Sequence, residues 1–277
     1  MPLRFTKMHG AGNDFVVLDR RNGSALPAPD ILARIADRHR GIGCDQVMVL
    51  TPGRSAGAVA GYRVINADGS DARQCGNGVR CLAAWLHRAG ALATAGVLDG
   101  PTGPVPVTVA ADGTIEATLD VPGFAAAALP MAGVEPAGDG RWQLPVDGAP
   151  LRFGAVAIGN PHVVIEVDDV ATAPVHLAPL LQAHPAFPQG CNVGFAQVLA
   201  RDRIALRVVE RGVGETLACG SGACAAQAWL RRAGRVDQDC SVELPGGRLG
   251  VRWSGADATP VRLRGPAVFV FEGEFTP

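Results

Sequence analysis

Residues 75–90 read CGNGVRCLAAWLHRAG, and residues 219–234 read CGSGACAAQAWLRRAG. The two stretches align without a gap at an offset of 144 (219 − 75 = 144), which pairs their first cysteines, their tryptophans and their final glycines. The same offset pairs residues 63–66 (RVIN) with residues 207–210 (RVVE). A match of this kind between distant parts of one chain indicates an internal repeat.

Two further pairs of motifs extend the repeat toward the start of each half. Residues 12–13 (GN) match residues 159–160 (GN), and residues 43–45 (GCD) match residues 190–192 (GCN), at an offset of 147 (160 − 13 = 147). All of these pairs occur in the same order along the chain. The sequence therefore predicts two homologous halves.

Each half contains β-rich apolar runs followed by a glycine-rich turn and a helix. Residues 15–18 and 163–167 are typical of the strands. The CGxG motif leads into a helix of about 14 residues that ends at Ala-Gly, a usual C-terminal signal. Both helices are apolar on most sides, which indicates burial. We expect an α/β (α+β) fold of two pseudo-symmetric domains, each a curved, mostly antiparallel sheet around one central helix.

The boundary between the halves is expected near residues 121–123 (VPG), where the hydrophobic periodicity lapses. The strand-like run at residues 267–271 (AVFVF) is expected to return to the first half. These features predict one domain of residues 1–120 plus 264–277 and a second of residues 121–263. The active site is expected in the cleft between the two domains.

Composition limits the possible partners and the compartment. The 277 residues are 48% hydrophobic and 18% charged, with a formal net charge of −1, so there is no electrostatic reason to expect a nucleic-acid or membrane partner. No apolar run reaches the roughly 18–20 residues of a membrane span. The sequence MPLRFTKMHG at the N-terminus lacks the apolar core of a signal peptide. We expect a cytoplasmic protein.

Cysteine and lysine usage argues against a cofactor or metal. The chain has seven cysteines, an odd number, and no CxxC pair, so neither a disulfide framework nor a zinc ribbon is expected. Lys7 is the only lysine and would have to form the Schiff base of a pyridoxal-phosphate enzyme. Its surroundings are typical of the end of a first strand. We therefore predict chemistry that needs no cofactor and no metal.

Cys75 and Cys219 are the predicted acid–base pair. Inversion of an α-carbon without a cofactor requires one group to remove a proton from one face and a second group to deliver a proton to the other. The start of a helix favours the thiolate through its free N–H groups and its dipole, so both cysteines are expected to have a lowered pKa. The glycines that follow leave those N–H groups open to a substrate carboxylate and to the developing carbanion.

Other polar residues at the repeat motifs are weighed against structural roles. Glu210 and Arg211 adjoin at a strand end and form either a solvated ion pair or a site for an ammonium and a carboxylate. A lone histidine such as His162 has a structural role more often than a catalytic one. Ordinary turn roles are the alternative for the loop asparagines Asn13, Asn66, Asn77, Asn160 and Asn192. Turn or capping roles are expected for Asp14, Asp45, Asp68 and Asp71. Buried structural roles are expected for Cys44, Cys81, Cys224 and Cys240, and Cys191 is intermediate.

Six ordered motifs together resemble the diaminopimelate epimerase family: HGAGNDF (9–15), GIGCDQ (41–46), NADGSDARQCGNGVRC (66–81), GNPH (159–162), GCNVGF (190–195) and ERGVGETLACGSGACA (210–225). The resemblance runs from about residue 5 to the C-terminus and is weakest around residues 95–150 and 168–186. It implies interconversion of LL- and meso-diaminopimelate in bacterial lysine and peptidoglycan biosynthesis, through two cysteines and no cofactor.

The resemblance also implies roles for individual residues. Cys75 and Cys219 would be the catalytic pair, and His162 and Glu210 would tune the thiol pKa values. The implied substrate-binding positions are Asn13, Gln46, Asn66, Gly76, Asn77, Asn160, Asn192, Glu210, Arg211, Gly220 and Ser221. Members are commonly homodimers, and Phe271 stands where some carry an interface tyrosine. Ser221 stands where threonine is more usual.

Two alternatives remain open from the sequence. A proline or hydroxyproline racemase of related fold would share the two cysteines but would not need Glu210 and Arg211 to bind a second, distal amino-acid head. A non-catalytic redox sensor would use Cys75 and Cys219 as a reversible disulfide. Measuring α-proton exchange on LL-diaminopimelate and on proline tests the first alternative. Measuring the epimerase activity of a Cys219→Ala variant tests the second.

Overall fold

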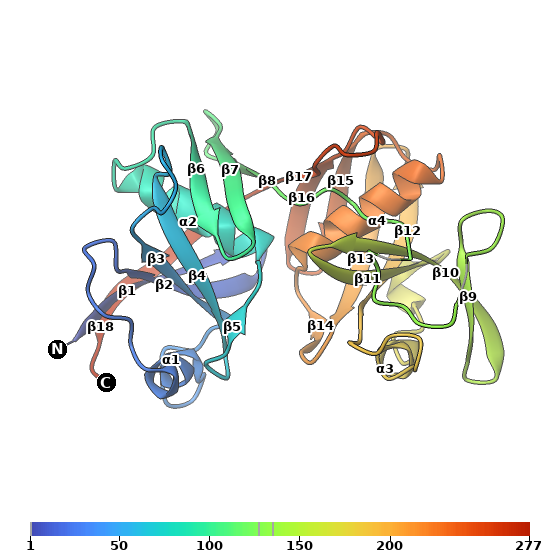
Figure 1. Cartoon of the computed structure of the whole chain (residues 1–277), viewed down its shortest axis with the longest axis horizontal. Helices are drawn as coiled ribbons and strands as arrows, with labels where there is room; N and C mark the ends of the chain where they lie inside the picture. Colours follow the sequence, from blue (N-terminus) through green and yellow to red (C-terminus); the bar gives the residue numbers. More distant parts are fainter. Residues whose placement is uncertain (1, 127, 135) are drawn as a thin grey trace. The chain divides into compact units, whose positions relative to one another are not determined.

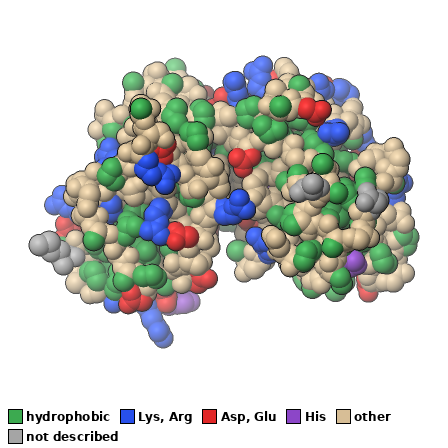
Figure 2. All heavy atoms as spheres, viewed as in Figure 1, with side chains coloured by type: hydrophobic (Ala, Val, Ile, Leu, Met, Phe, Trp, Pro, Cys, Tyr) green, Lys and Arg blue, Asp and Glu red, His purple; other side chains and the backbone are tan. Residues whose placement is uncertain are grey.

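The computed structural model describes residues 2–126, 128–134 and 136–277. The fold is mixed α/β and consists mostly of strands. The chain forms two compact units (Figure 1): unit 1 combines Met1–Thr118 with Arg264–Pro277, and unit 2 is Leu119–Leu263. Among the described residues, no helix has both the length and the apolar character to cross a membrane. Figure 2 shows acidic and basic side chains interspersed on the visible face, in keeping with the near-neutral net charge.

Unit 1 is a sheet of mainly antiparallel strands with two helices. Strands β1–β2, β3–β4, β4–β5, β6–β7, β7–β8 and β1–β18 pair antiparallel, whereas β2–β3 and β4–β6 pair parallel. The elements are β1 (Leu3–Gly10), β2 (Asn13–Asp19), α1 (Pro29–Ala36), β3 (Gln46–Thr51), β4 (Ala60–Asn66), β5 (Asp71–Ala72), α2 (Gly76–Arg88), β6 (Ala95–Gly100), β7 (Gly103–Val109), β8 (Ile115–Thr118) and β18 (Val268–Phe275). The last strand, β18, pairs antiparallel with β1.

Unit 2 repeats this order of elements. Strands β9–β10, β10–β11, β12–β13, β13–β14 and β15–β16 pair antiparallel, whereas β11–β12 and β13–β15 pair parallel. The elements are β9 (Trp142–Val146), β10 (Ala149–Ile158), β11 (Asn160–Glu166), η1 (Val170–Thr172), α3 (Leu177–Gln182), β12 (Asn192–Ala200), β13 (Arg203–Glu210), β14 (Gly214–Thr216), α4 (Gly220–Arg232), β15 (Asp239–Leu244) and β16 (Gly247–Arg252). Strand β17 (Arg262–Gly265) includes the point in the sequence where unit 2 ends and the last part of unit 1 begins. Strands β10–β16 with α4 thus correspond to β1–β7 with α2, which confirms the predicted repeat.

The helices α2 and α4 occupy the same place in the two units. Each has 13 residues, of which nine are buried in α2 and ten in α4. Figure 1 shows each helix lying against the strands of its own unit. Each ends before a glycine in the left-handed region, Gly90 and Gly234, both with φ of 71°. Both helices therefore end at the predicted Ala-Gly, because glycine adopts this conformation without a Cβ clash.

Trp229 of α4 packs directly on the backbone of β10. The tryptophan is 6% exposed, and a Cβ built at Gly154 of β10 would lie 2.2 Å from Cδ2 of the ring. Only a glycine lets the strand approach the ring so closely. This contact fixes the outer part of α4, and so the direction of the whole helix, against the sheet.

We expect Gly154→Ala to lower the free energy of unfolding by about 1–3 kcal/mol, because the buried ring must move to admit the methyl group. Urea denaturation measures the loss. Gly138→Ala is the control, since a Cβ there meets no atom within 4 Å. Equal stability of the two variants would contradict the packing of Trp229 on β10.

Candidate active site

In unit 1, three polar residues lie at the same ends of three neighbouring strands. Asn13 begins β2, Gln46 begins β3, and Asn66 ends β4. Because β2 and β3 run parallel and Gln46 is the antiparallel partner of Asn66, the three residues lie at the same strand ends. Gln46 Nε2 donates to Asn66 Oδ1 at 3.1 Å. The structure therefore brings together three of the residues that the sequence selected.

Unit 2 has the same arrangement with different side chains. Asn160 begins β11, Asn192 begins β12, and Glu210 ends β13. Strands β11 and β12 are parallel and β13 is antiparallel to β12, as in unit 1. The position that holds Asn66 in unit 1 therefore holds a carboxylate in unit 2.

Both proposed catalytic cysteines are N-cap residues of the central helices. Cys75 precedes α2 and Cys219 precedes α4, both with extended backbone. The helices begin with Gly76-Asn77 and Gly220-Ser221, whose N–H groups have no partner one turn earlier within the helix. Such a helix start can bind a carboxylate.

Cys75 lies in a cluster of amides. It is half-buried, whereas the other six cysteines are buried. Its Sγ donates to Asn13 Oδ1 at 3.7 Å, and Asn77 Nδ2 donates to the same oxygen at 3.2 Å. Asn77 is 1% exposed, so this contact is sheltered from water. The structure thus places Asn13, Cys75 and Asn77 in direct contact.

Cys219 has a more anionic and more enclosed environment. Its Sγ accepts a hydrogen bond from Gly222 N at 3.4 Å and lies 3.6 Å from Ser221 Oγ. Burial, and then the Glu210 carboxylate, raise the pKa of Cys219 well above its usual value. The expectation of a lowered pKa is therefore wrong for Cys219, because burial and a neighbouring negative charge outweigh the helix start. Glu210 itself accepts from Thr216 Oγ1 at 2.6 Å.

His162 is a buried, neutral histidine. It is 2% exposed, and burial, with a smaller effect of Arg211, lowers its pKa to about 3. Its Nε2 lies 2.9 Å from Asn160 Oδ1. Since an uncharged imidazole can donate to this oxygen, His162 orients Asn160 but carries no positive charge to stabilise a thiolate.

Asn192 and Arg211 are joined through the backbone. Asn192 is 4% exposed, and its Oδ1 accepts from the backbone N of Arg211 at 2.8 Å. The guanidinium of Arg211 donates to the carbonyl oxygen of Gln189. Asn192 therefore supports the segment that presents Glu210 and Arg211, and the binding of a carboxylate by Arg211 stays a prediction.

A group of charged residues behind Asn13 was missed from the sequence. Asp14 accepts from Lys7 Nζ at 2.5 Å and from Arg38 Nη2 at 2.8 Å. Although burial alone would raise it, these two cations hold the pKa of Asp14 at about 2. Asp45 was interpreted as a turn residue, but its carboxylate binds Arg38 and the amide of Asn13. The motif GIGCDQ could have indicated Asp45, since it directly precedes Gln46.

The remaining cysteines have structural positions. Cys44, Cys81, Cys191, Cys224 and Cys240 are all buried, as predicted for four of them. Burial raises the pKa to about 12 in Cys44, Cys81 and Cys191 and to about 11 in Cys240. Within the described residues, no cluster of three or more His, Cys, Asp or Glu side chains could hold a metal ion.

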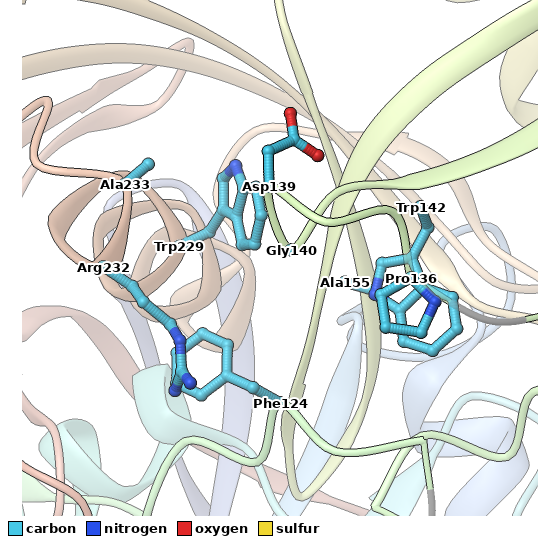
Figure 3. A pocket seen from close by; sticks show the side chains of 9 residues that line it. All are labelled: Phe124, Pro136, Asp139, Gly140, Trp142, Ala155, Trp229, Arg232 and Ala233. Carbon is cyan, nitrogen blue, oxygen red and sulfur yellow. The ribbon is translucent and has the colours of Figure 1, made fainter.

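A pocket of about 280 Å³ in unit 2 lies away from these residues (Figure 3). It is lined by aromatic, small and charged residues, none of them a predicted site residue: Phe124, Pro136, Asp139, Gly140, Trp142, Ala155, Trp229, Arg232 and Ala233. Trp229 lies ten residues after Cys219 on α4, a rise of about 15 Å. The pocket is therefore separate from the candidate site.

Comparison with known proteins places the chain among epimerases. The family model described as diaminopimelate epimerase matches residues 5–122 and 154–270. A diaminopimelate epimerase of Xanthomonas campestris pv. campestris is 54% identical over 275 residues, covering 99% of this chain and 96% of the relative. An O-ureido-serine racemase of Streptomyces lavendulae is 53% identical over 275 residues, covering 99% and 95%.

Solved structures support the fold assignment. A hydroxyproline epimerase from Agrobacterium vitis superposes with a TM-score of 0.72 at 17% identity, covering 99% of this chain and 92% of that one. A phenazine biosynthesis protein from Bacillus anthracis gives 0.71 at 16% identity, covering all of both chains. At such identities the likeness extends to the fold alone, whereas the family match and the 54% identity extend to the family. The chain belongs to the diaminopimelate epimerase family.

Proposed function

We propose that the chain interconverts LL- and meso-diaminopimelate by proton transfer at the α-carbon, with Cys75 and Cys219 as the two acid–base groups. The observation that carries this proposal is the pair of N-cap cysteines, each followed by a glycine-rich helix start and accompanied by the same strand-end polar positions. The 54% identity to a diaminopimelate epimerase supports the choice of substrate. We place this activity in lysine and peptidoglycan biosynthesis, in the cytoplasm.

The surroundings of the two thiols differ, and we assign the acid and base roles from this difference. Cys219 holds its proton at neutral pH, because burial and Glu210 raise its pKa. Cys75 is half-buried, and the acceptor for its Sγ is the neutral amide of Asn13. In the turnover that starts from this state, Cys75 is the base that removes the α-proton and Cys219 the acid that delivers one. After inversion Cys75 carries a proton and Cys219 is the thiolate, so the reverse reaction uses the opposite roles.

The amides at the helix starts supply the electrostatic stabilisation that this chemistry needs. We assign the substrate carboxylate to the N–H groups of Gly76-Asn77 and Gly220-Ser221, where preorganised donors are worth about 3–4 kcal/mol each in comparable sites. The remaining polar positions are assigned to the two amino-acid heads of the substrate: Asn13, Gln46, Asn66, Asn160, Asn192, Glu210 and Arg211. Arg211 would bind a carboxylate and Glu210 an ammonium.

We further assign the two units to the two epimerase halves, residues 1–120 plus 264–277 and residues 121–263, and propose that the protein is a homodimer. Phe271 on β18 is 49% exposed although its ring packs edge-on against Phe5. An aromatic ring that remains half-exposed on a strand is suited to a contact with a second copy. Neither a nucleic acid nor a membrane is expected as a partner.

A second candidate substrate is O-ureido-serine. The racemase of Streptomyces lavendulae named for it is 53% identical over nearly the full chain, almost the same as the diaminopimelate epimerases. The two substrates share an α-amino-acid head but differ at the other end, where diaminopimelate carries a second amino-acid head. The charged pair Glu210 and Arg211 favours the substrate with charged groups at both ends.

Proton exchange in D2O tests the substrate directly. Reduced protein is incubated with LL-diaminopimelate, O-ureido-L-serine or L-proline, and the loss of the α-proton is followed by NMR. We expect the fastest loss from LL-diaminopimelate and none from L-proline. Loss from O-ureido-L-serine alone would transfer the assignment to that substrate, and loss from L-proline alone would contradict it. The Cys75→Ala, Cys219→Ala double variant serves as the inactive control.

A further inference from the structure

The amide of Asn13 is held in place by a carboxylate. Asn13 Nδ2 donates to Asp45 Oδ2 at 2.7 Å, and the backbone N of Asp14 donates to the same oxygen at 3.1 Å. The other oxygen of Asp45 accepts from Arg38 Nη2 at 2.7 Å. Both oxygens of Asp45 are therefore occupied by donors that come from separate segments of unit 1.

This carboxylate dictates which way the amide faces. An ionised carboxylate only accepts hydrogen bonds, so the group of Asn13 that faces Asp45 must be the NH2. The amide oxygen then points the other way, where it meets Cys75 Sγ at 3.7 Å and Asn77 Nδ2 at 3.2 Å. A flipped amide would place its oxygen against a carboxylate and its NH2 against the NH2 of Asn77.

We propose that Asp45 is a positioning residue of the active site, which orients the Asn13 amide so that its oxygen, and not its nitrogen, faces the Cys75 thiol and accepts a hydrogen bond from it. This inference rests on the proposed function for its catalytic meaning, because it concerns one of the two proposed acid–base groups. Asp45 acts through Asn13 and does not itself touch the sulfur.

Among the described residues of unit 2, the equivalent asparagine is held differently. In strand register Asn192 matches Gln46, so the position of Asp45 is held in unit 2 by Cys191, which has no carboxylate, and the oxygen of Asn192 accepts from the backbone of Arg211. Asn160, the equivalent of Asn13, is bound instead through its oxygen by the neutral His162. The two asparagines are thus oriented in opposite senses, by an acceptor in unit 1 and by a donor in unit 2.

The groups around Cys75 set the sign of the expected effect. Arg80 on α2 is fully buried and lies against Gly76 O at 3.5 Å, and Cys81 lies on the same helix. Across Asn13 lie the cations and carboxylates of the network: Lys7, Asp14, Arg38 and Asp45. A bare acceptor facing a thiol favours the protonated form, whereas an NH2 donor favours the thiolate. Compared with a flipped amide, Asn13 as oriented therefore disfavours the thiolate of Cys75.

The test is the pH dependence of Cys75 alkylation by iodoacetamide, measured in a Cys219→Ala background and located by peptide mass spectrometry. Asp45→Asn lets the Asn13 amide turn over, so we expect the alkylation midpoint to fall by about one pH unit. Asp14→Asn is the matched control, because it removes a carboxylate that also binds Arg38 but leaves the Asn13 to Asp45 contact in place. We expect its shift to be less than half as large.

A second variant tests the same step from the other side. Asn13→Ala removes the acceptor oxygen, so the midpoint is expected to fall by itself, and Asp45→Asn is expected to add nothing in that background. Equal shifts in Asp45→Asn and Asp14→Asn, or a full Asp45→Asn shift without Asn13, would overturn the proposal in favour of a simple charge effect. An unchanged midpoint in Asn13→Ala would also overturn it.

Alkylation needs no substrate, so this outcome is independent of the proposed function. If the protein acts on none of the three substrates but the midpoints shift as expected, the assigned reaction is wrong and the role of Asp45 stands. If LL-diaminopimelate is epimerised but the midpoints do not move, the reverse holds. Circular dichroism of each variant confirms that it is folded before alkylation is measured.

Discussion

Cys219→Ala is expected to reduce the epimerisation of LL-diaminopimelate at least about a thousand-fold, and Cys75→Ala equally so, because each variant loses the proton donor or acceptor on one face of the α-carbon. Each cysteine alone can still remove a proton from its own face and return a deuteron to the same face. Each single variant should therefore retain slow exchange of the α-proton of one stereoisomer without inversion. The two variants should differ in which isomer they exchange.

Chiral chromatography measures inversion, and NMR in D2O measures exchange. The double variant should show neither, and Cys224→Ala, a buried cysteine on the same helix as Cys219, should retain both. Full epimerisation by Cys219→Ala would contradict the two-base mechanism and favour the redox-sensor alternative. Exchange of the same isomer by both single variants would mean that the two thiols do not act from opposite faces.

The parts of the fold that depend on local sequence could be predicted from it. The starts of α2 and α4 follow from CGxG and their ends from Ala-Gly, because caps and stop signals act within one turn of the helix. Strands β2 and β11 follow from the apolar runs at residues 15–18 and 163–167, although β11 ends at Glu166. The run at residues 267–271 was expected to return to the first half, but its pairing with β1 is seen only in the structure.

The properties of the candidate site that depend on distant residues could not be predicted. The raised pKa of Cys219 requires knowledge of its burial and of the distance to Glu210, nine residues earlier (219 − 210 = 9). The contact between Asp45 and Asn13 joins residues 32 positions apart. Local patterns showed which residues were polar and near a repeat motif, but not which atoms face each other. That information exists only once the strands have paired.

His162 is expected to make the protein acid-sensitive through its burial. Its pKa is about 3 in the folded protein, against 6.5 when unperturbed, because burial disfavours the imidazolium. Between these two values the unfolded chain binds a proton at this residue and the folded protein does not, so the free energy of unfolding falls as the pH falls. Above about pH 6.5 this residue causes no loss of stability. Below that pH the free energy of unfolding falls by about 1.4 kcal/mol per pH unit, a total loss of about 4–5 kcal/mol near pH 3.

Urea denaturation between pH 7 and pH 4.5 measures this loss in the wild type, His162→Gln and His176→Gln. Glutamine keeps an amide that can donate to Asn160 but takes up no proton, so His162→Gln should lose stability toward acid more slowly than the wild type, by about 2.5 kcal/mol over this range. His176 is exposed, so its replacement should leave the pH dependence unchanged. Carboxylates such as Asp14 contribute equally to all three proteins, so the difference between them isolates residue 162. Identical acid profiles for the wild type and His162→Gln would mean that the imidazole reaches water or a carboxylate, and the orientation of Asn160 by a neutral histidine would then be wrong.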